Sequence, residues 1–156
     1  MTISSTALIT ATEDTAYSYR VTAADVDIGD MVTLAGTTVP SWLTFTEPTG
    51  ELAGIPINGD VGSHNVVITA TDSAGLAVTD SFSISVENTN DAPAISSLAL
   101  TAATEDTAYS YLVTAADVDL GDMVTLTGTT LPGWLTFDPS TGTLAGTPTN
   151  DDVGSH

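Results

Sequence analysis

The stretch Val86-Glu87-Asn88-Thr89-Asn90-Asp91-Ala92-Pro93-Ala94-Ile95 separates two copies of the same sequence unit. It carries carboxylates and carboxamides, and it has no run of glycine or serine. Pro93 fixes its own φ angle, lacks a backbone donor and biases Ala92 toward an extended conformation. A segment of this composition is stiffer than a Gly/Ser linker. We therefore expect a stiff joint, lined with oxygen atoms, between two folded units.

The repeat becomes visible when the chain is shifted by 92 residues, which aligns residues 4–64 with residues 96–156. Of the 61 aligned positions, 46 are identical. Nothing equivalent to residues 65–92 follows the second copy. The repeat predicts a complete domain over residues 1–91 and a second domain over residues 92–156 that lacks its C-terminal strands. We expect the chain to be a fragment of a longer array.

The residue pattern of the first unit is typical of short strands. Residues 17–23 alternate between apolar and polar side chains, and residues 81–86 do the same, which is the period of a half-buried strand. Turn sequences such as Pro48-Thr49-Gly50 and Asp72-Ser73-Ala74-Gly75 separate these segments. Helical periodicity does not persist anywhere. About seven short strands in the roughly 90 residues of the first unit predict an all-β, Greek-key β-sandwich.

The charge of the chain excludes several classes of partner. Twenty acidic residues accompany one basic residue, Arg20, and the formal net charge is −19. Such a surface repels nucleic acids and anionic membranes and attracts divalent cations. The chain has no cysteine, which excludes a disulfide scaffold, and no apolar run long enough to insert into a membrane. We expect neither nucleic-acid binding nor direct membrane insertion.

The run Leu131-Pro-Gly-Trp-Leu-Thr-Phe-Asp-Pro-Ser-Thr-Gly-Thr-Leu-Ala-Gly-Thr-Pro148 resembles the signature of dystroglycan-type cadherin-like domains, also named "putative Ig domains". Residues 40–45 and 49–56 repeat it in the first unit. Domains of this family occur in tandem in large bacterial surface and secreted proteins, and they are similar to cadherin repeats, which bind calcium between successive domains. The resemblance implies a cadherin/Ig-like sandwich and an extracellular or cell-surface location.

The resemblance also implies two calcium sites, carried over position by position. The ligands of an interdomain site would be Glu13, Asn88, Asn90, Asp91, Asp117 and Asp119. The ligands of a partial site at the N-terminal end of the first unit would be Asp25, Asp27 and Asp72. One element departs from the cadherin pattern, because the segment 53–56 replaces an Asp-Arg-Glu motif and has no carboxylate. Fewer ions or weaker binding should follow.

The same acidic residues have a simpler explanation. Calcium takes six to eight oxygen ligands, which carboxylates and carboxamides supply. A solvated acidic surface suited to high salt has the same composition, and on the residues alone it is the better explanation. The resemblance favours calcium. The loop of residues 25–30 lacks the distal glutamate of an EF-hand, so we do not expect a self-contained site there.

Other residue types give little sign of chemistry. Trp42 and Trp134 could stack on sugars, but both lie in compact apolar segments, which favours core packing. His64 and His156 each stand alone, which favours a turn or surface role over a metal site. No Gly-x-Ser-x-Gly motif occurs, and no insertion would form a cleft around an acidic pair. We do not expect an enzyme.

Two functions remain open from the sequence. The favoured hypothesis is a calcium-binding extracellular repeat that acts as a rigid spacer or adhesion module, with adjacent repeats and a cell-surface protein or glycan as its partners. The alternative is a glycan- or protein-binding accessory module of a secreted hydrolase.

Overall fold

The computed structural model describes residues 1–27 and 29–156. Ile28, which belongs to the predicted acidic loop of the first unit, lies outside the described residues. The chain forms two compact units, unit 1 (Met1–Thr89) and unit 2 (Asn90–His156). The described residues form strands and two short 3-10 turns and no α-helix, so the all-β prediction is confirmed. The described residues hold no helix that could span a membrane.

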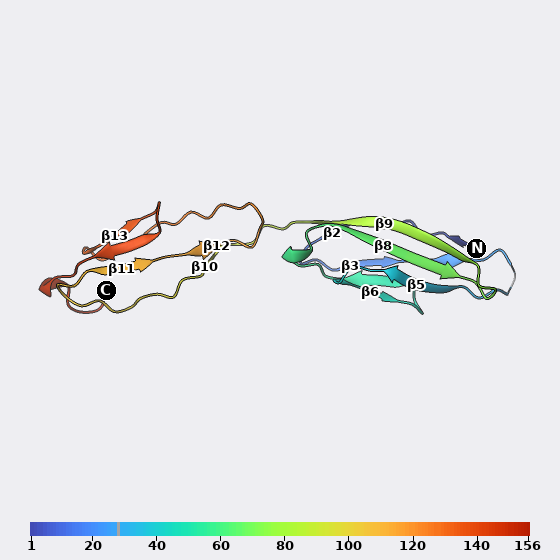
Figure 1. Cartoon of the computed structure of the whole chain (residues 1–156), viewed down its shortest axis with the longest axis horizontal. Coiled ribbons are helices and arrows are strands. Elements are labelled where there is room, and N and C mark those ends of the chain that lie inside the picture. Colours follow the sequence, from blue (N-terminus) through green and yellow to red (C-terminus); the bar gives the residue numbers. More distant parts are fainter. Residues whose placement is uncertain (28) are drawn as a thin grey trace. The chain divides into compact units, whose positions relative to one another are not determined.

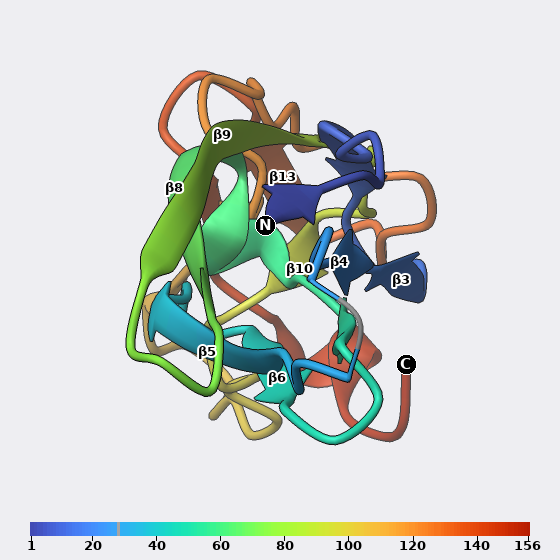
Figure 2. The same ribbon diagram turned by 90° about the vertical axis from the view of Figure 1, so that its right-hand side faces the viewer.

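Unit 1 is a β-sandwich of two main sheets (Figure 1). One sheet has the strand order β2-β9-β8-β5 and the other β3-β7-β6, while β1 pairs with β4. The strand bounds are β1 (Thr2–Ile3), β2 (Thr10–Thr12), β3 (Tyr17–Arg20), β4 (Ala23–Ala24), β5 (Thr33–Thr38), β6 (Leu43–Thr46), β7 (Glu51–Gly54), β8 (Gly62–Thr71) and β9 (Ala77–Glu87). In Figure 2 the long strands β8 and β9 run along one side of unit 1, and β3 lies on the other.

The β8–β9 hairpin supplies much of the core of unit 1. Val66 and Ile68 on β8 and Ile84 on β9 are fully buried, because alternate side chains of a strand point to the same face. Leu52, on the opposite sheet, is also fully buried and belongs to the same apolar cluster. The predicted inward face of both strands is confirmed, although Phe82 is only half-buried.

The turn of the hairpin is held by one aspartate. The carboxylate Oδ1 of Asp72 accepts hydrogen bonds from the backbone amides of Ala74 (2.9 Å) and Leu76 (2.8 Å). Aspartate is favoured in turns because its side chain can bond to the backbone two residues further on. The two strands then pair from Thr71 and Ala77 outward to Gly62 and Val86.

Unit 2 repeats only part of this architecture. Its strands are β10 (Ala94–Ile95), β11 (Tyr109–Leu112), β12 (Ala115–Ala116), β13 (Leu135–Asp138) and β14 (Thr143–Gly146). The sheet β11-β14-β13 matches β3-β7-β6 in order and register, and β10 pairs with β12 as β1 does with β4. Within residues 90–156 no strand corresponds to β2, β5, β8 or β9.

One glycine keeps the same packing in both copies. A side chain at Gly54 would overlap the backbone carbonyl of Trp42, and a side chain at Gly146 would overlap that of Trp134. The close approach of these backbones leaves room for glycine alone. The three-stranded sheet is therefore specified locally in each unit.

Candidate functional site

Glu13 lies directly after β2 at one end of unit 1, and its carboxylate is held by the backbone. The side chain is 1% exposed. Its backbone nitrogen donates to the carbonyl of Glu87 (3.0 Å), and its Oε1 accepts a hydrogen bond from the Thr89 amide (2.7 Å). The second oxygen, Oε2, is buried and has no hydrogen-bond partner among the described residues. One oxygen of this carboxylate therefore has a hydrogen-bond donor, and the other has none among the described residues.

The residue after Glu13 turns the chain sharply. Asp14 has a φ of 56°, in the left-handed region that aspartate tolerates better than most residues. Its backbone nitrogen donates to the carbonyl of Pro56 (2.8 Å). The turn fixes the position at which Glu13 leaves the strand.

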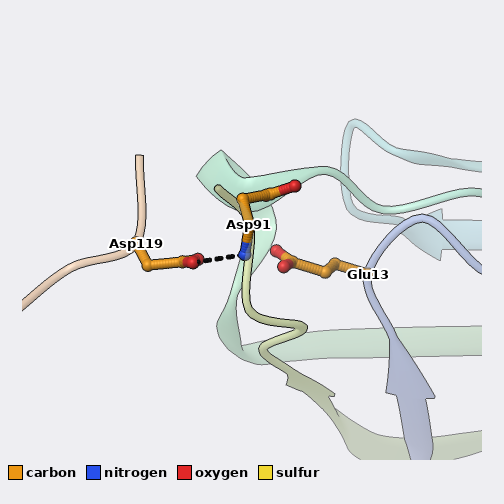
Figure 3. Close-up of side chains that lie close together, drawn as sticks. All are labelled: Glu13, Asp91 and Asp119. Atoms are coloured by element: carbon orange, nitrogen blue, oxygen red, sulfur yellow. Dashed lines mark hydrogen bonds between the residues drawn. The ribbon is translucent and has the colours of Figure 1, made fainter. Parts of the chain in front are cut away.

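Asp91 and Asp119 are brought together within unit 2. The backbone nitrogen of Asp91 donates to Oδ2 of Asp119 (2.6 Å), as Figure 3 shows. The backbone nitrogen of Asp119 donates to Oδ1 of Asp117 (3.0 Å), and Asp119 is only 6% exposed. Asp117, Asp119 and Asp122 each offer a carboxylate oxygen, and these oxygens lie within 4.8 Å of one another. The predicted Asp-x-Asp loop is thus a compact group of oxygen ligands.

The equivalent loop of unit 1 has the same geometry. The Asp27 amide donates to Oδ1 of Asp25 (2.9 Å), and Asp25, Asp27 and Asp30 offer oxygens within 4.8 Å of one another. The hydrogen bond from Asp27, chiefly, holds the pKa of the Asp25 carboxyl below its ordinary value. The ammonium group of Met1, 3.3 Å from Asp25 Oδ2, acts in the same direction.

The other predicted ligands are placed differently. Asp72 is not part of the Asp25 cluster, and its Oδ1 holds the β8–β9 turn. Its neighbour Ser73 does reach the cluster, since its hydroxyl donates to Asp30 Oδ1 (2.8 Å). The carboxamide of Asn90 donates to the carbonyl of Asp91 (2.7 Å), and Asn88 is exposed in unit 1.

Two cluster members were not among the predicted ligands. Asp30 and Asp122 complete the two carboxylate groups, each three residues after the second aspartate of its loop. The turns that bring them back are closed by bonds from Asp30 N to Asp27 O (3.3 Å) and from Asp122 N to Asp119 O (3.2 Å). The sequence signal was the third aspartate of Asp-x-Asp-x-Gly-Asp, which both units share.

Cationic side chains are scarce in this chain, which has one arginine and no lysine for twenty acidic residues. Arg20 is the only lysine or arginine in the sequence, and its Nε donates to the Thr49 carbonyl (3.0 Å). His64 and His156 each bond to a backbone carbonyl, of Asp60 and Asp152, at 2.6 Å. Groups made only of oxygen donors suit hard divalent cations such as calcium better than zinc or copper.

Comparison with curated proteins finds relatives among staphylococcal adhesins. The "Serine-rich adhesin for platelets" of Staphylococcus aureus strain MRSA252 is 34% identical over 119 residues, which is 76% of this chain. The same protein from strain USA300 matches equally. The chain spans less than a tenth of the length of these relatives (9% and 5%).

Solved structures share the fold. Human protocadherin-24 EC1-2 matches with a TM-score of 0.52 at 19% identity, over 84% of this chain and 69% of that one. Protocadherin gamma B7 extracellular cadherin domains 1–4 match with a TM-score of 0.51 at 18% identity, over 90% and 39%. These likenesses show that the fold is cadherin-like, as expected. The narrower assignment to the dystroglycan type stays a prediction.

The profile of the family described as "Putative Ig domain" matches residues 1–87 and again residues 92–156, which together are nearly the whole chain. The chain belongs to this family of Ig-like domains.

Proposed function

We propose that this chain is a calcium-binding repeat module that acts as a rigid spacer or adhesion element in a bacterial surface or secreted protein. In this proposal residues 1–91 form a complete sandwich, and residues 92–156 form a second one that lacks its last strands. Calcium binds where the two meet, with Glu13, Asp91 and Asp119 as its principal ligands.

The observation that carries the proposal is the buried carboxylate of Glu13. A carboxylate that is 1% exposed with one unpartnered oxygen is unfavourable unless a cation or a donor compensates it. The chain supplies no lysine, and the Nε of its one arginine, Arg20, donates to the Thr49 carbonyl. A divalent cation bound by oxygen atoms would complete this site.

The covalent chain supports placing a second carboxylate nearby. Glu13 accepts from the Thr89 amide, and Asp119 accepts from the Asp91 amide. Since one residue separates Thr89 from Asp91, their backbone nitrogens can be at most about 7 Å apart. Both carboxylates are therefore tied to one three-residue segment. In the proposal, a bound cation would offset the repulsion between the two carboxylates.

The relatives support the cellular role. The curated relatives are adhesins by name, and the family is described by its Ig-like fold. Both support a non-catalytic module on a bacterial surface, bound to neighbouring repeats and to a surface protein or glycan. Calcium at the joint would hold successive domains at a fixed angle and keep an array extended.

Thermal unfolding of the whole chain in EDTA and in millimolar calcium tests the proposal. Calcium should raise the unfolding midpoint, because a ligand at a hundredfold excess over its Kd adds about 2.7 kcal/mol to the free energy of unfolding. Glu13→Gln should remove the calcium-dependent rise. Glu105→Gln is the matched control, because Glu105 occupies the equivalent position in unit 2 and is exposed.

Equal midpoints with and without calcium would remove the calcium proposal. An identical rise with magnesium would point to general charge screening by a divalent cation. If Glu105→Gln abolished the rise as fully as Glu13→Gln, the site would not depend on the buried carboxylate.

A further inference from the structure

The sequence contains one Asn-Gly pair, Asn58-Gly59, and it lies in the 3-10 turn η1 (Asn58–Asp60) between β7 and β8. Asn58 is half-buried and Gly59 is exposed. The side-chain amide carbon of an asparagine, Cγ, can be attacked by the backbone nitrogen of the next residue, and asparagine is accordingly a thermolabile residue. Glycine has no side chain to hinder the attack. The pair therefore places an electrophile and an unhindered nucleophile in adjacent residues.

The fold does not require a glycine at position 59. Gly59 is not among the glycines with a positive φ angle, and a Cβ placed there would meet no atom within 4 Å apart from its chain neighbours. In unit 2 the equivalent position, in the 3-10 turn η2 (Asn150–Asp152), is occupied by Asp151. Gly59 thus alters the reactivity of Asn58 without being needed for the shape of the turn.

The two turns otherwise have the same hydrogen bonds. In η1 the Asp60 amide donates to the Ile57 carbonyl (2.7 Å), and the Ile57 amide donates to Asp60 Oδ2 (3.0 Å). In η2 the same two bonds join Asp152 and Thr149 (3.0 and 2.9 Å). The chain therefore contains two matched turns that differ in the residue after the asparagine.

We infer that Asn58 is a site of spontaneous deamidation, and that the isoaspartate product loosens the turn. The backbone nitrogen of Gly59 forms a bond to Asn58 Cγ, the bond from Cγ to the side-chain nitrogen breaks, and that nitrogen leaves as ammonia with the proton of the attacking amide. Water then opens the cyclic imide at either carbonyl, which leaves an aspartate or an isoaspartate at position 58. The reaction consumes only water and transfers no electrons. The inference does not depend on calcium.

The attack requires a local opening of η1. The backbone of Asn58 must rotate out of the 3-10 conformation, whose ψ is about −20 to −30°, before Cγ can reach the next nitrogen. Short 3-10 segments have poor hydrogen-bond geometry, and the bond from the Val61 amide to the Asn58 carbonyl is long, at 3.3 Å. Segments of this kind open without unfolding of the whole domain. The reaction can therefore proceed in the folded chain.

The isoaspartate product adds one carbon to the main chain between residues 58 and 59. The turn is tied to its surroundings on both sides, because the fully buried Pro56 accepts a bond from the Asp14 amide (2.8 Å) and the Asp60 carbonyl lies 2.6 Å from His64 Nε2. A longer main chain cannot keep all of these contacts and the bond from the Asp60 amide. Amide exchange at Asp14 and Asp60 should be faster in the isoaspartate form.

The test is incubation of the intact 156-residue chain at mildly alkaline pH, followed by mass spectrometry of the fragments that contain Asn58 and Asn150. Asn150 is exposed and Asn58 is half-buried, so accessibility favours reaction at Asn150, whereas the following glycine favours reaction at Asn58. Asn58 should lose ammonia faster. Its fragment alone should become a substrate for an isoaspartate-specific methyltransferase, and hydrogen exchange of the aged chain measures the loosening.

A pair of exchanged residues gives matched controls. Gly59→Asp gives η1 the Asn-Asp pair of η2, and it should reduce the conversion of Asn58 to the rate seen at Asn150 while leaving the unfolding midpoint of the fresh protein unchanged. Asp151→Gly gives η2 the Asn-Gly pair and should accelerate conversion at Asn150. Both positions are exposed, so neither substitution disturbs the core.

Several outcomes would overturn the inference. Equal conversion of the two asparagines, or faster conversion of Asn150, would show that the following glycine does not decide the reaction. Conversion of Asn58 that is unaffected by Gly59→Asp would show the same. Aspartate without isoaspartate would mean that water attacks the side-chain amide directly. Unchanged amide exchange at Asp14 and Asp60 in the isoaspartate form would contradict the loosening of the turn.

Discussion

Unit 1 and unit 2 use nearly the same sequence to different effect. Leu52 is fully buried in unit 1, while its counterpart Leu144 is only half-buried in unit 2. The local strands around them have the same register in both units. What differs is the second sheet, which β8 and β9 supply to unit 1 alone. Burial is therefore decided by the sheet that lies opposite a side chain, not by its neighbours in sequence.

The same lesson applies to strand formation. Residues 33–38 form β5, whereas residues 125–130, which differ from them only at Ala35 and Thr127, form no strand. The amides and carbonyls of β5 pair with β8. Without a partner strand the backbone groups bond to water instead, and an extended conformation is not fixed.

The burial of Glu13, the candidate metal ligand, also depends on the second sheet. Glu13 and Glu105 follow nearly identical residues, yet Glu13 is 1% exposed and Glu105 lies on the surface. Glu13 is held by the backbone of Glu87 and Thr89 at and beyond the end of β9. The glutamate of this repeat is buried in the unit that has its last strand and exposed in the unit that does not.

The largest effect is expected from a substitution that makes unit 1 resemble unit 2. Ile68→Asp places a carboxylate at a fully buried position of β8, and it should reduce the free energy of unfolding of unit 1 by more than about 4 kcal/mol. Amide exchange at residues 33–38 should then rise to the rate seen at 125–130. Residue-resolved hydrogen exchange measures both segments in one sample. Protection of 33–38 that survives the substitution would mean that β5 does not depend on β8.

A smaller difference in unfolding free energy is expected between Leu52→Ala in unit 1 and Leu144→Ala in unit 2. Leu52→Ala should cost about 2–5 kcal/mol, because it leaves a cavity in a closed core. Leu144→Ala should cost less than about half of that, since part of the side chain is already exposed to water. Urea unfolding, followed by probes specific to each unit, gives both values. Equal costs would mean that Leu144 is enclosed as fully as Leu52.

The smallest effect concerns pH. Burial, chiefly, and the neighbouring Tyr19 raise the pKa of Tyr17 to about 12, whereas an unfolded tyrosine ionises near pH 10. The unfolded state therefore loses its proton first, so the stability of unit 1 should fall as the pH rises from about 10 to about 12. Tyr17→Phe should reduce this slope, after a constant loss from the missing hydrogen bond to the Leu8 carbonyl. Unfolding curves measured across this range compare the two proteins, and an unchanged slope would place the alkaline sensitivity elsewhere.

The sequence predicted a good part of the candidate site. The Asp-x-Asp loops could be found because their geometry is local, with each second aspartate donating its amide to the first. The role of Asp72 could not, because the sequence does not reveal that its Oδ1 accepts the Ala74 and Leu76 amides and that the residue stays outside the Asp25 cluster. The unpartnered oxygen of Glu13 could not be predicted either, because segments far away in the sequence bury this side chain.

For the fold, the sequence alone determined the repeat, the all-β class, the turns and the alternation that makes one face of β8 and β9 apolar. These features are encoded within a few residues, by side-chain period and turn chemistry. Only the tertiary structure decided that Leu52 is buried and Leu144 is not, that 33–38 is a strand and 125–130 is not, and that Glu13 is enclosed while Glu105 is exposed. The physical reason is that burial and strand pairing need a partner surface from residues far away in the chain, and identical local sequences cannot record whether that partner is there.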